Sequence, residues 1–218
     1  MPRRPSLSVD AIVEAAVRVA DLGGLAQVSM RNVGKELGVE AMSLYHHLSG
    51  KEALLDALAD WAFARIELPE AAKPWRPAMA ARAASARQVL SAHPWALGLL
   101  ESRRTPGPAL LRHHDVVLGC LRASAFPVAL AAHAYSALDA YVYGFVLTEL
   151  NLPFEAGEGA EKFVATLAPT LADHYPHLTE MVLELVVGRD YDYADEFAYG
   201  LDLVLDGLET RLAAVLDR

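Results

Sequence analysis

Proline and glycine divide this chain of 218 residues into segments whose apolar side chains recur at helical spacing, which constrains the fold more than any other feature. Ala and Leu dominate the segments, and the β-branched alternation typical of strands is scarce. The clearest break, at residues 68–77, contains three prolines and indicates a connection between two helical units. We therefore predict an all-α protein with one domain at residues 1–68 and a larger domain at residues 69–218, divided into roughly five or six helices.

Helix start and stop signals follow one another closely in the first quarter of the chain. Ser8 is placed to cap a first helix that the glycine pair at residues 23–24 ends. Ser29 is placed to cap a second helix that ends at residues 37–39, where Gly38 lies. These signals predict two well-bounded helices before residue 40.

The next segment predicts a third helix at residues 40–46, and Ser49 to Glu52 predict a capping box that opens a fourth helix. Short helix, glycine turn and short helix form the outline of a helix-turn-helix. Because a helix of about two turns is unstable alone in water, Leu44 and Leu48 are its expected anchors in the core. The other side chains are small, polar or flat aromatic, and they suit either entry into a DNA major groove or an ordinary amphipathic turn: Ala41, Met42, Ser43, Tyr45, His46 and His47.

Residues 28–58 closely resemble the DNA-binding signature of the tetracycline-repressor (TetR) family. The run from Leu44 to Leu48, followed by Lys51 and Glu52, is the diagnostic part. The resemblance implies a three-helix helix-turn-helix domain that binds double-stranded operator DNA. It places eight residues on the family's DNA-contacting positions: Arg31, Ala41, Met42, Ser43, Tyr45, His46, His47 and Lys51.

These eight residues differ in what they can contact. Tyr45, His47 and Lys51 resemble phosphate contacts, and the other five face bases. The family often has Tyr or Trp at position 46, where this chain has His, and neither Ala41 nor Met42 can make a bidentate hydrogen bond. Direct readout of the base sequence is therefore expected to depend heavily on Arg31 and Ser43.

The charge distribution permits DNA binding although the net charge is −9. Residues 1–51 carry six basic and five acidic side chains, which leaves +1 there and −10 on the remainder. The acidic character therefore belongs to the part of the chain after residue 51. A polyanion requires basic groups at its binding surface, which the first 51 residues supply. The distribution suits a small DNA-binding head on an acidic body.

The last long segment has a pattern that predicts an interface between two copies of the chain. Apolar side chains recur on one stripe, and Gly200 and Gly207 leave room for another helix at a cost of about 1 kcal/mol each. The segment also resembles the tetracycline-repressor-type C-terminal domain, in which helices corresponding to residues 127–150 and 191–216 pair with those of a second copy. The expected interface contains Gly200, Leu201, Val204, Gly207 and Leu208.

A pocket for an unknown small-molecule effector is expected in the second domain. Tyr135, Asp139 and Tyr143 form a polar stripe on an otherwise apolar helix. Trp95 is a further candidate wall, although filling the core is the favoured role for its aromatic ring. Asp139 is costly to bury without a partner. A structural Arg or hydroxyl is the first expectation, followed by a ligand and then by the dimer seam.

Other functions find less support. The pairs His113–His114 and His174–His177 offer metal-ligand types, but their spacing favours satisfied or exposed histidines, and Cys120 suits a small buried hydrophobe. We expect no metal, no cofactor and no enzyme activity. The alternatives are a helical small-molecule-binding protein and a metal-dependent enzyme, neither of which binds DNA.

The expected compartment is the cytoplasm. A single cysteine and the absence of an apolar leader favour a reducing environment. The apolar stretch at residues 128–148 contains Asp139, whose cost in a membrane is about 2.5–3.5 kcal/mol, so no membrane partner is expected. The combined expectation is a homodimeric repressor that binds a palindromic operator and is released by its effector.

Overall fold

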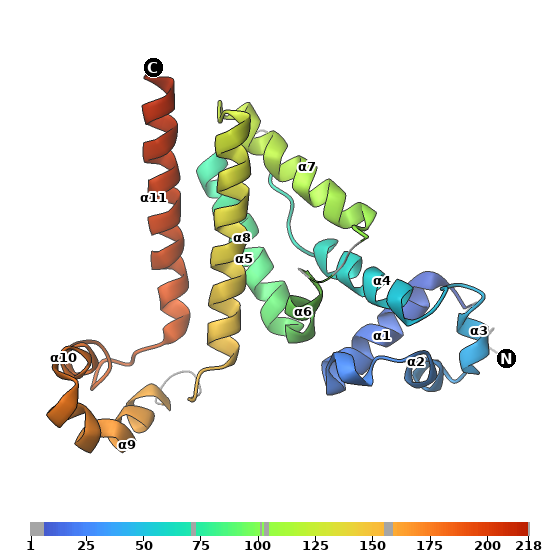
Figure 1. The fold of residues 1–218 in the computed structure, drawn as a ribbon, viewed down its shortest axis with the longest axis horizontal. Helices are drawn as coiled ribbons and strands as arrows, with labels where there is room; N and C mark the ends of the chain where they lie inside the picture. The colour runs from blue at the N-terminus through green and yellow to red at the C-terminus, as the bar shows by residue number, and fades with distance from the viewer. Residues whose placement is uncertain (1–6, 71–72, 101, 103–104, 155–158, 218) are drawn as a thin grey trace. The chain divides into compact units, whose positions relative to one another are not determined.

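The computed structural model describes residues 7–70, 73–100, 102, 105–154 and 159–217, except for the side chains at 168–170 and 172–173. Within these ranges every regular element is a helix (Figure 1), which confirms the all-α prediction. None of the described helices is long and apolar enough to cross a membrane. The chain divides into two compact units, Met1–Tyr143 and Gly144–Arg218. Arg3 and Arg4, which contribute to the basic charge of the N-terminal segment, lie outside the described residues.

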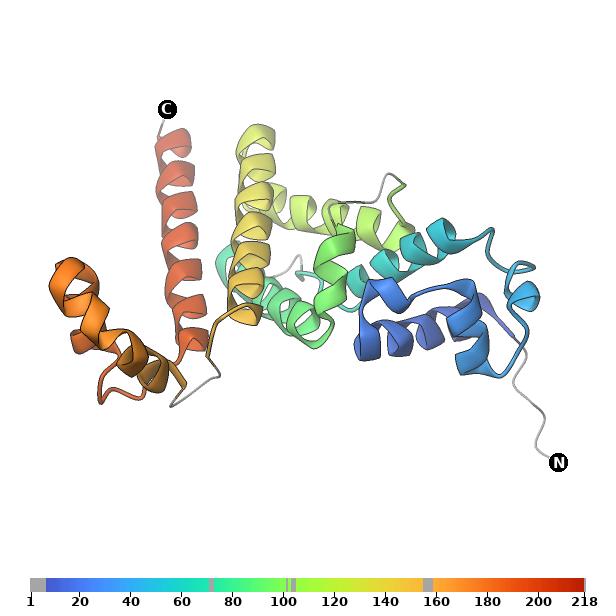
Figure 2. The same ribbon diagram turned by 60° about the horizontal axis from the view of Figure 1, so that its bottom comes forward.

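The first unit begins with the helices α1 (Val9–Gly23), η1 (Leu25–Gln27), α2 (Met30–Leu37), α3 (Ala41–Leu44) and α4 (Lys51–Phe63). Both serine caps are confirmed, because the Ser8 and Ser29 hydroxyls accept hydrogen bonds from the N–H groups three residues further on, at 3.2 and 3.1 Å. Gly38 ends α2 in the left-handed conformation, with φ of 66°. Figures 1 and 2 show α1, α2 and α3 clustered with α4.

Two predictions for this region are wrong. The third helix was expected over residues 40–46, but α3 has only four residues, and the chain continues as turns through His47. The capping box is also wrong, because α4 begins at Lys51 with Gly50 as its N-cap and with no side chain capping it among the described residues. Gly50 adopts a φ of 145°, which favours glycine, so Ser49 lies one residue too early to serve as the cap.

The rest of the first unit contains α5 (Trp75–Ala92), η2 (Pro94–Ala96), α6 (Leu97–Leu100), α7 (Pro108–Ala123) and α8 (Val128–Leu150), the last of which continues into the second unit. Packing of α1 against α4 and of α4 against α7 joins the N-terminal helices to this part of the unit. Ile12, Leu54 and Leu58 are completely buried there. The core is therefore continuous from the N-terminal helices to α7.

The second unit contains the end of α8, then α9 (Gly159–His174), α10 (Pro176–Leu185), η3 (Tyr193–Asp195) and α11 (Glu196–Leu216). Figure 2 shows α9 and α10 next to each other near the start of α11. Phe145 of α8 stacks on Tyr193 and meets the edge of Phe197, each at 5.0 Å between ring centroids. These aromatic contacts hold the start of α11 against the end of α8.

The predicted helix count and the last helix boundary need correction. The described residues from 73 onward form seven α-helices, α5 to α11. The turn at His93–Pro94 separates α6 from α5, and residues 186–195 separate α10 from α11. The last helix was expected to begin at Tyr191. It begins at Glu196, because the Asp192 carboxylate accepts the Ala194 N–H at 2.9 Å and forms a tighter turn first.

Candidate functional site

The turn between α2 and α3 depends on close contact between the two helices. The Val39 N–H donates to the Gly34 carbonyl at 2.9 Å. A Cβ added at Gly34 would lie 2.9 Å from the Val39 carbonyl oxygen and 3.2 Å from the Ala41 nitrogen. Only a glycine therefore fits at this point of α2 without a shift of the backbone, and sequence reasoning did not single it out.

The eight residues expected to contact DNA lie at the surface of this motif. Six of them are exposed, and Ala41 and Ser43 are half-buried. Met42 is 71% exposed on α3. Of the two expected anchors, Leu44 is completely buried and Leu48 is half-buried. A hollow of about 410 Å³ beside the turn is lined by Arg31, Asn32, Lys35, Val39, Glu40 and Ala41. The surface combines basic, aromatic and hydrogen-bonding side chains around a short helix.

Lys51 begins α4 directly beside this surface. The first N–H groups of a helix have no partner within the helix, and the positive end of the helix dipole lies there. Because no described side chain caps α4, these N–H groups remain able to bind an anion, together with the exposed Lys51 ammonium. This end of α4 is suited to a phosphate group.

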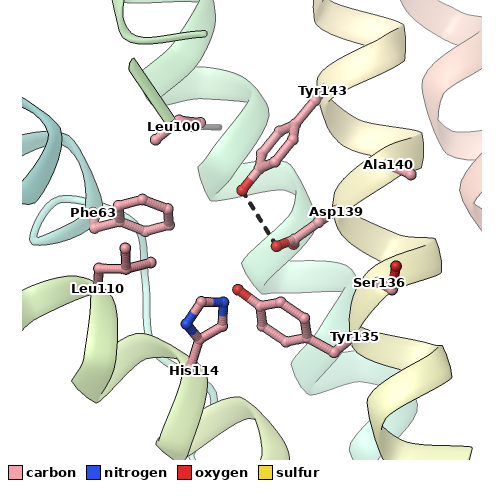
Figure 3. A pocket seen from close by; sticks show the side chains of 9 residues that line it. All are labelled: Phe63, Leu100, Leu110, His114, Tyr135, Ser136, Asp139, Ala140 and Tyr143. Carbon is pink, nitrogen blue, oxygen red and sulfur yellow. Dashed lines mark hydrogen bonds between the residues drawn. The ribbon is translucent and has the colours of Figure 1, made fainter. Parts of the chain in front are cut away.

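A cavity of about 340 Å³ lies at the opposite end of α4, within the same unit. Figure 3 shows Tyr135, Asp139 and Tyr143 of α8 facing Phe63 of α4 and side chains of α6 and α7. Three of the four predicted pocket residues are thus brought together. The remaining lining residues are Leu100, Leu110, His114, Ser136 and Ala140.

Asp139 has the structural partner that the sequence required. The Arg82 guanidinium donates through Nη2 to Asp139 Oδ1, and the Tyr143 hydroxyl donates to Oδ2 at 3.2 Å. The Arg82 side chain is only 1% exposed, and Asp139 is 8% exposed. The buried carboxylate is therefore paired with a buried cation, and both its oxygens accept hydrogen bonds.

His113 extends this buried network. Arg82 Nε donates to His113 Nε2 at 2.8 Å, so Nε2 is the acceptor and the ring proton lies on Nδ1. Burial, and then the charge of Arg82, lower the pKa of His113 to about 4. Burial, and then the charge of Asp139, raise the pKa of Tyr143 well above its usual value. At neutral pH His113 and Tyr143 are therefore both neutral, and they lie beside the ion pair of Arg82 and Asp139.

Comparisons with known proteins match both the N-terminal helices that carry the candidate DNA surface and the region that contains the cavity. The sequence model for "Bacterial regulatory proteins, tetR family" matches residues 12–58, and that for "Tetracyclin repressor-like, C-terminal domain" matches residues 68–212. The HTH-type transcriptional repressor DrrR1 of Streptomyces coeruleorubidus is 33% identical over 96% of this chain and 80% of its own length.

This chain belongs to the TetR family. The class A tetracycline repressor of transposon 1721 from Escherichia coli is 29% identical, covering 96% of this chain and 94% of its own. The crystal structure of ActR from Streptomyces coelicolor in complex with actinorhodin has a TM-score of 0.77 at 25% identity, covering 94% of this chain and 96% of that one. The chain is a ligand-responsive DNA-binding transcriptional repressor and not an enzyme.

The fourth predicted pocket residue of this TetR-family chain lies elsewhere. Trp95 does not line the cavity; its indole N–H donates to Asp21 at 2.6 Å, and His93 Nδ1 contacts the same carboxylate oxygen at 2.8 Å. Asp21 belongs to α1, so this cluster fastens the N-terminal helices to the turn after α5. Because the Trp95 side chain is buried, its indole N–H needs a hydrogen-bond partner, and a carboxylate on α1 supplies it.

A second carboxylate connects α4 to α7. Asp60 Oδ1 accepts hydrogen bonds from the Ala109 and Leu110 N–H groups, at 2.8 and 3.0 Å, and so caps α7. Leu110 and His114 of α7 line the cavity, as does Phe63 of α4. The helix that starts at the candidate DNA surface is thus bound directly to the cavity wall.

Some of the residues expected at a dimer interface are buried within the single chain, and others remain exposed. Leu201 and Leu208 are already buried within the single chain, in a stripe completed by Phe197, Leu205 and Leu212. Val204 is half-buried, and its neighbour Leu205 belongs to the buried stripe instead. Gly207 is exposed, and a Cβ added there would have no heavy atom within 4 Å. Gly200 and Gly207 lie on the same side of α11 as the exposed Leu203 and Tyr199.

The histidines considered above as metal ligands, and Cys120, lie in different parts of the chain. His113 is buried in the core, where its Nε2 accepts the Arg82 hydrogen bond and its Nδ1 has no hydrogen-bond partner among the described residues. His174 ends α9, and Pro176 begins α10 before His177. Within the described residues, no group of three or more His, Cys, Asp or Glu side chains is arranged to hold a metal ion. Cys120 is buried, and burial raises the pKa of its thiol, which makes it a small hydrophobic residue of the core.

Proposed function

We propose that this chain acts in the cytoplasm as a homodimer that represses transcription from a palindromic operator and leaves it when a small organic effector enters the cavity of the first unit. One observation carries the proposal. Helix α4 has Lys51 at the candidate DNA surface and Phe63 in the cavity wall, so a ligand that moves one end of α4 moves the other. Its 13 residues separate the two sites by about 20 Å at 1.5 Å per residue.

The hydrogen bonds of two carboxylates support this coupling. Asp60 ties α4 to α7 on the cavity side, and Asp21 ties α1 to the turn that contains His93 and Trp95. A ligand between α4, α7 and α8 would shift these helices and so change the separation of the two DNA-reading heads. Such coupling is typically worth about 1–3 kcal/mol. ActR, which shares this fold, has been crystallised with actinorhodin and with (S)-DNPA, which favours an organic effector here as well.

Selection of bound sequences from random duplex DNA, at a stated salt concentration, tests the proposal. A two-fold symmetric enrichment with half-sites about 34–36 Å apart is expected for a dimeric helix-turn-helix protein. Enrichment of a single asymmetric half-site would contradict the dimer. If no sequence is enriched, the palindromic operator is contradicted as well.

Two substitutions at the DNA surface should have different effects. Lys51→Ala is expected to weaken binding to all duplexes about equally, and to reduce the slope of log affinity against log salt by close to one unit, because one phosphate contact is lost. Arg31→Ala should instead relax the sequence preference, because Arg31 faces bases. Fluorescence anisotropy at several salt concentrations, on operator and scrambled DNA, separates the two effects. An unchanged salt slope for Lys51→Ala would remove Lys51 from the phosphate contacts.

A substitution on α11 should separate the dimer. Because Gly207 is exposed and the space beside it is open in the single chain, Gly207→Leu should leave the fold of each copy intact. In a dimer that packs helices closely at this glycine, the leucine side chain should prevent association. Sedimentation at micromolar concentration measures the result, with Asp202→Leu, on another exposed position of α11, as the matched control. A wild-type monomer, or an undisturbed Gly207→Leu dimer, would exclude this face.

A further inference from the structure

The cavity wall carries a carboxylate whose charge is already balanced. Arg82 donates to Asp139 Oδ1 from a position that is 1% exposed and is not among the residues lining the cavity. The neighbouring His113 stays neutral, because its Nε2 accepts the Arg82 Nε hydrogen bond. Because Arg82 and Asp139 already neutralise each other, a charged ligand would find no unpaired opposite charge in the cavity. Burying an unpaired charge is costly, so the cavity disfavours charged ligands.

Asp139 nevertheless retains capacity to accept hydrogen bonds on the cavity side. A carboxylate has about four lone-pair positions, and Arg82 and Tyr143 use one each. Asp139 itself lines the cavity. A ligand O–H group could therefore donate to it, and hydrogen bonds to an ionised acceptor are stronger than those between neutral groups.

The remaining walls favour an aromatic body. Phe63, Tyr135, Tyr143 and His114 present rings to the cavity, with Leu100 and Leu110 between them (Figure 3). The volume of about 340 Å³ lies at the lower end of the range of ligand pockets, which extends from about 300 to 1,000 Å³. Rings of this kind stack on flat ligands.

We propose that this cavity selects an uncharged aromatic compound that carries a hydroxyl group, and that the hydroxyl donates to Asp139 while Arg82 excludes cations by balancing the charge of Asp139. This inference rests on the proposed function, because it assigns the chemical class of the effector to the same cavity. Arg82 is thus a specificity-determining residue that acts through Asp139.

Four probes with one ring system test the inference on the wild-type protein. Naphthol is neutral and has a donor, methoxynaphthalene is neutral without one, and naphthoate and naphthylmethylammonium carry opposite charges at pH 7. Calorimetric titration should give the tightest binding for naphthol. Removal of the donor in methoxynaphthalene should weaken binding about tenfold to hundredfold, as expected for a hydrogen bond to a charged acceptor. Both ions should bind more weakly than naphthol.

Two variants reveal the part played by charge. Asp139→Asn keeps the shape but leaves the Arg82 charge unbalanced, so naphthoate affinity should rise about tenfold or more while naphthol affinity falls. Arg82→Gln combined with Asp139→Asn is neutral again and should return naphthoate to its wild-type affinity. Thermal melting establishes whether each variant is folded. If Asp139→Asn does not fold, the affinities of the four probes for the wild-type protein test the inference by themselves.

The position of the bound probe must also be fixed, because α9 and α10 enclose a separate apolar cavity of about 310 Å³ in the second unit. Ala140→Trp should fill the cavity beside Asp139 and weaken naphthol binding at least tenfold, whereas Val182→Trp should fill the other cavity without effect. An ion that binds the wild type more tightly than naphthol overturns the inference and leaves the proposed function standing. If no probe binds, the inference fails and the proposed function stands. If naphthol binds but Ala140→Trp has no effect, the cavity is not the effector site and both proposals fail.

Discussion

Arg82→Met is expected to lower the free energy of unfolding at pH 7 by about 3–5 kcal/mol, which is the usual cost of leaving one partner of a buried ion pair alone. The substitution leaves the Asp139 carboxylate buried without its cation and removes the donor to His113 Nε2. Methionine has a similar length and is apolar, so loss of packing contributes little. Urea unfolding at fixed protein concentration measures the change, because association with a second copy would also add to the apparent stability.

The same substitution in an exposed ion pair provides the control. Arg18 pairs with Glu36 at 2.7 Å on the surface, where such pairs contribute about 0–1 kcal/mol. Arg18→Met should therefore have a small effect. Combining Arg82→Met with Asp139→Leu removes both buried charges and should restore more than half of the lost stability. Equal costs for Arg82→Met and Arg18→Met would show that the buried pair is not what stabilises this region.

The partner of Asp139 illustrates what the sequence could not provide. The need for a partner follows from one residue and its apolar neighbours. The identity of the partner depends on the packing of α5 against α8, across 57 residues of sequence. A signal does exist, because Arg82 interrupts the apolar stripe of α5 formed by Trp75, Ala78, Met79, Ala83, Ala86 and Leu90. An arginine within a buried stripe indicates a buried acid elsewhere.

Local signals predicted local structure well where the backbone was ordinary. Ser8 and Ser29 cap their helices as expected, because an N-cap involves only the next three residues. Ser49 failed for an equally local reason, since Gly50 can adopt a φ of 145° and take the cap position. The glycine that matters most for the motif, Gly34, gave no signal, because its closeness to Val39 appears only when the turn is folded.

The cavity was predictable only where one helix supplied its wall. Tyr135, Asp139 and Tyr143 repeat at four-residue steps of α8 and therefore share a face. Phe63 and His114 come from α4 and α7, and nothing in their own segments distinguishes them from core residues. Trp95 was expected in the pocket because of its aromatic ring alone. The side chain lies beside α1 instead, where its indole N–H donates to Asp21.

Leu44→Ala is expected to abolish tight operator binding while the rest of the molecule stays folded. Leu44 is completely buried, and it is the only buried side chain of α3. A helix of four residues cannot persist without such an anchor. Truncating a buried leucine to alanine costs about 2–5 kcal/mol, so operator affinity should fall roughly thirtyfold or more as α3 leaves its position.

The expected loss for Leu44→Ala is specific to DNA binding and can be separated from general damage. Leu22→Ala makes the same chemical change on α1 at a side chain that is 88% exposed, and it should change neither stability nor operator affinity by more than about 0.5 kcal/mol. Naphthol binding and sedimentation of Leu44→Ala should match the wild type, because the cavity and α11 do not involve α3. If the Leu44→Ala and Leu22→Ala variants bind operator equally tightly, the position of α3 does not affect affinity. Helix α3 would then not be the element that reads DNA.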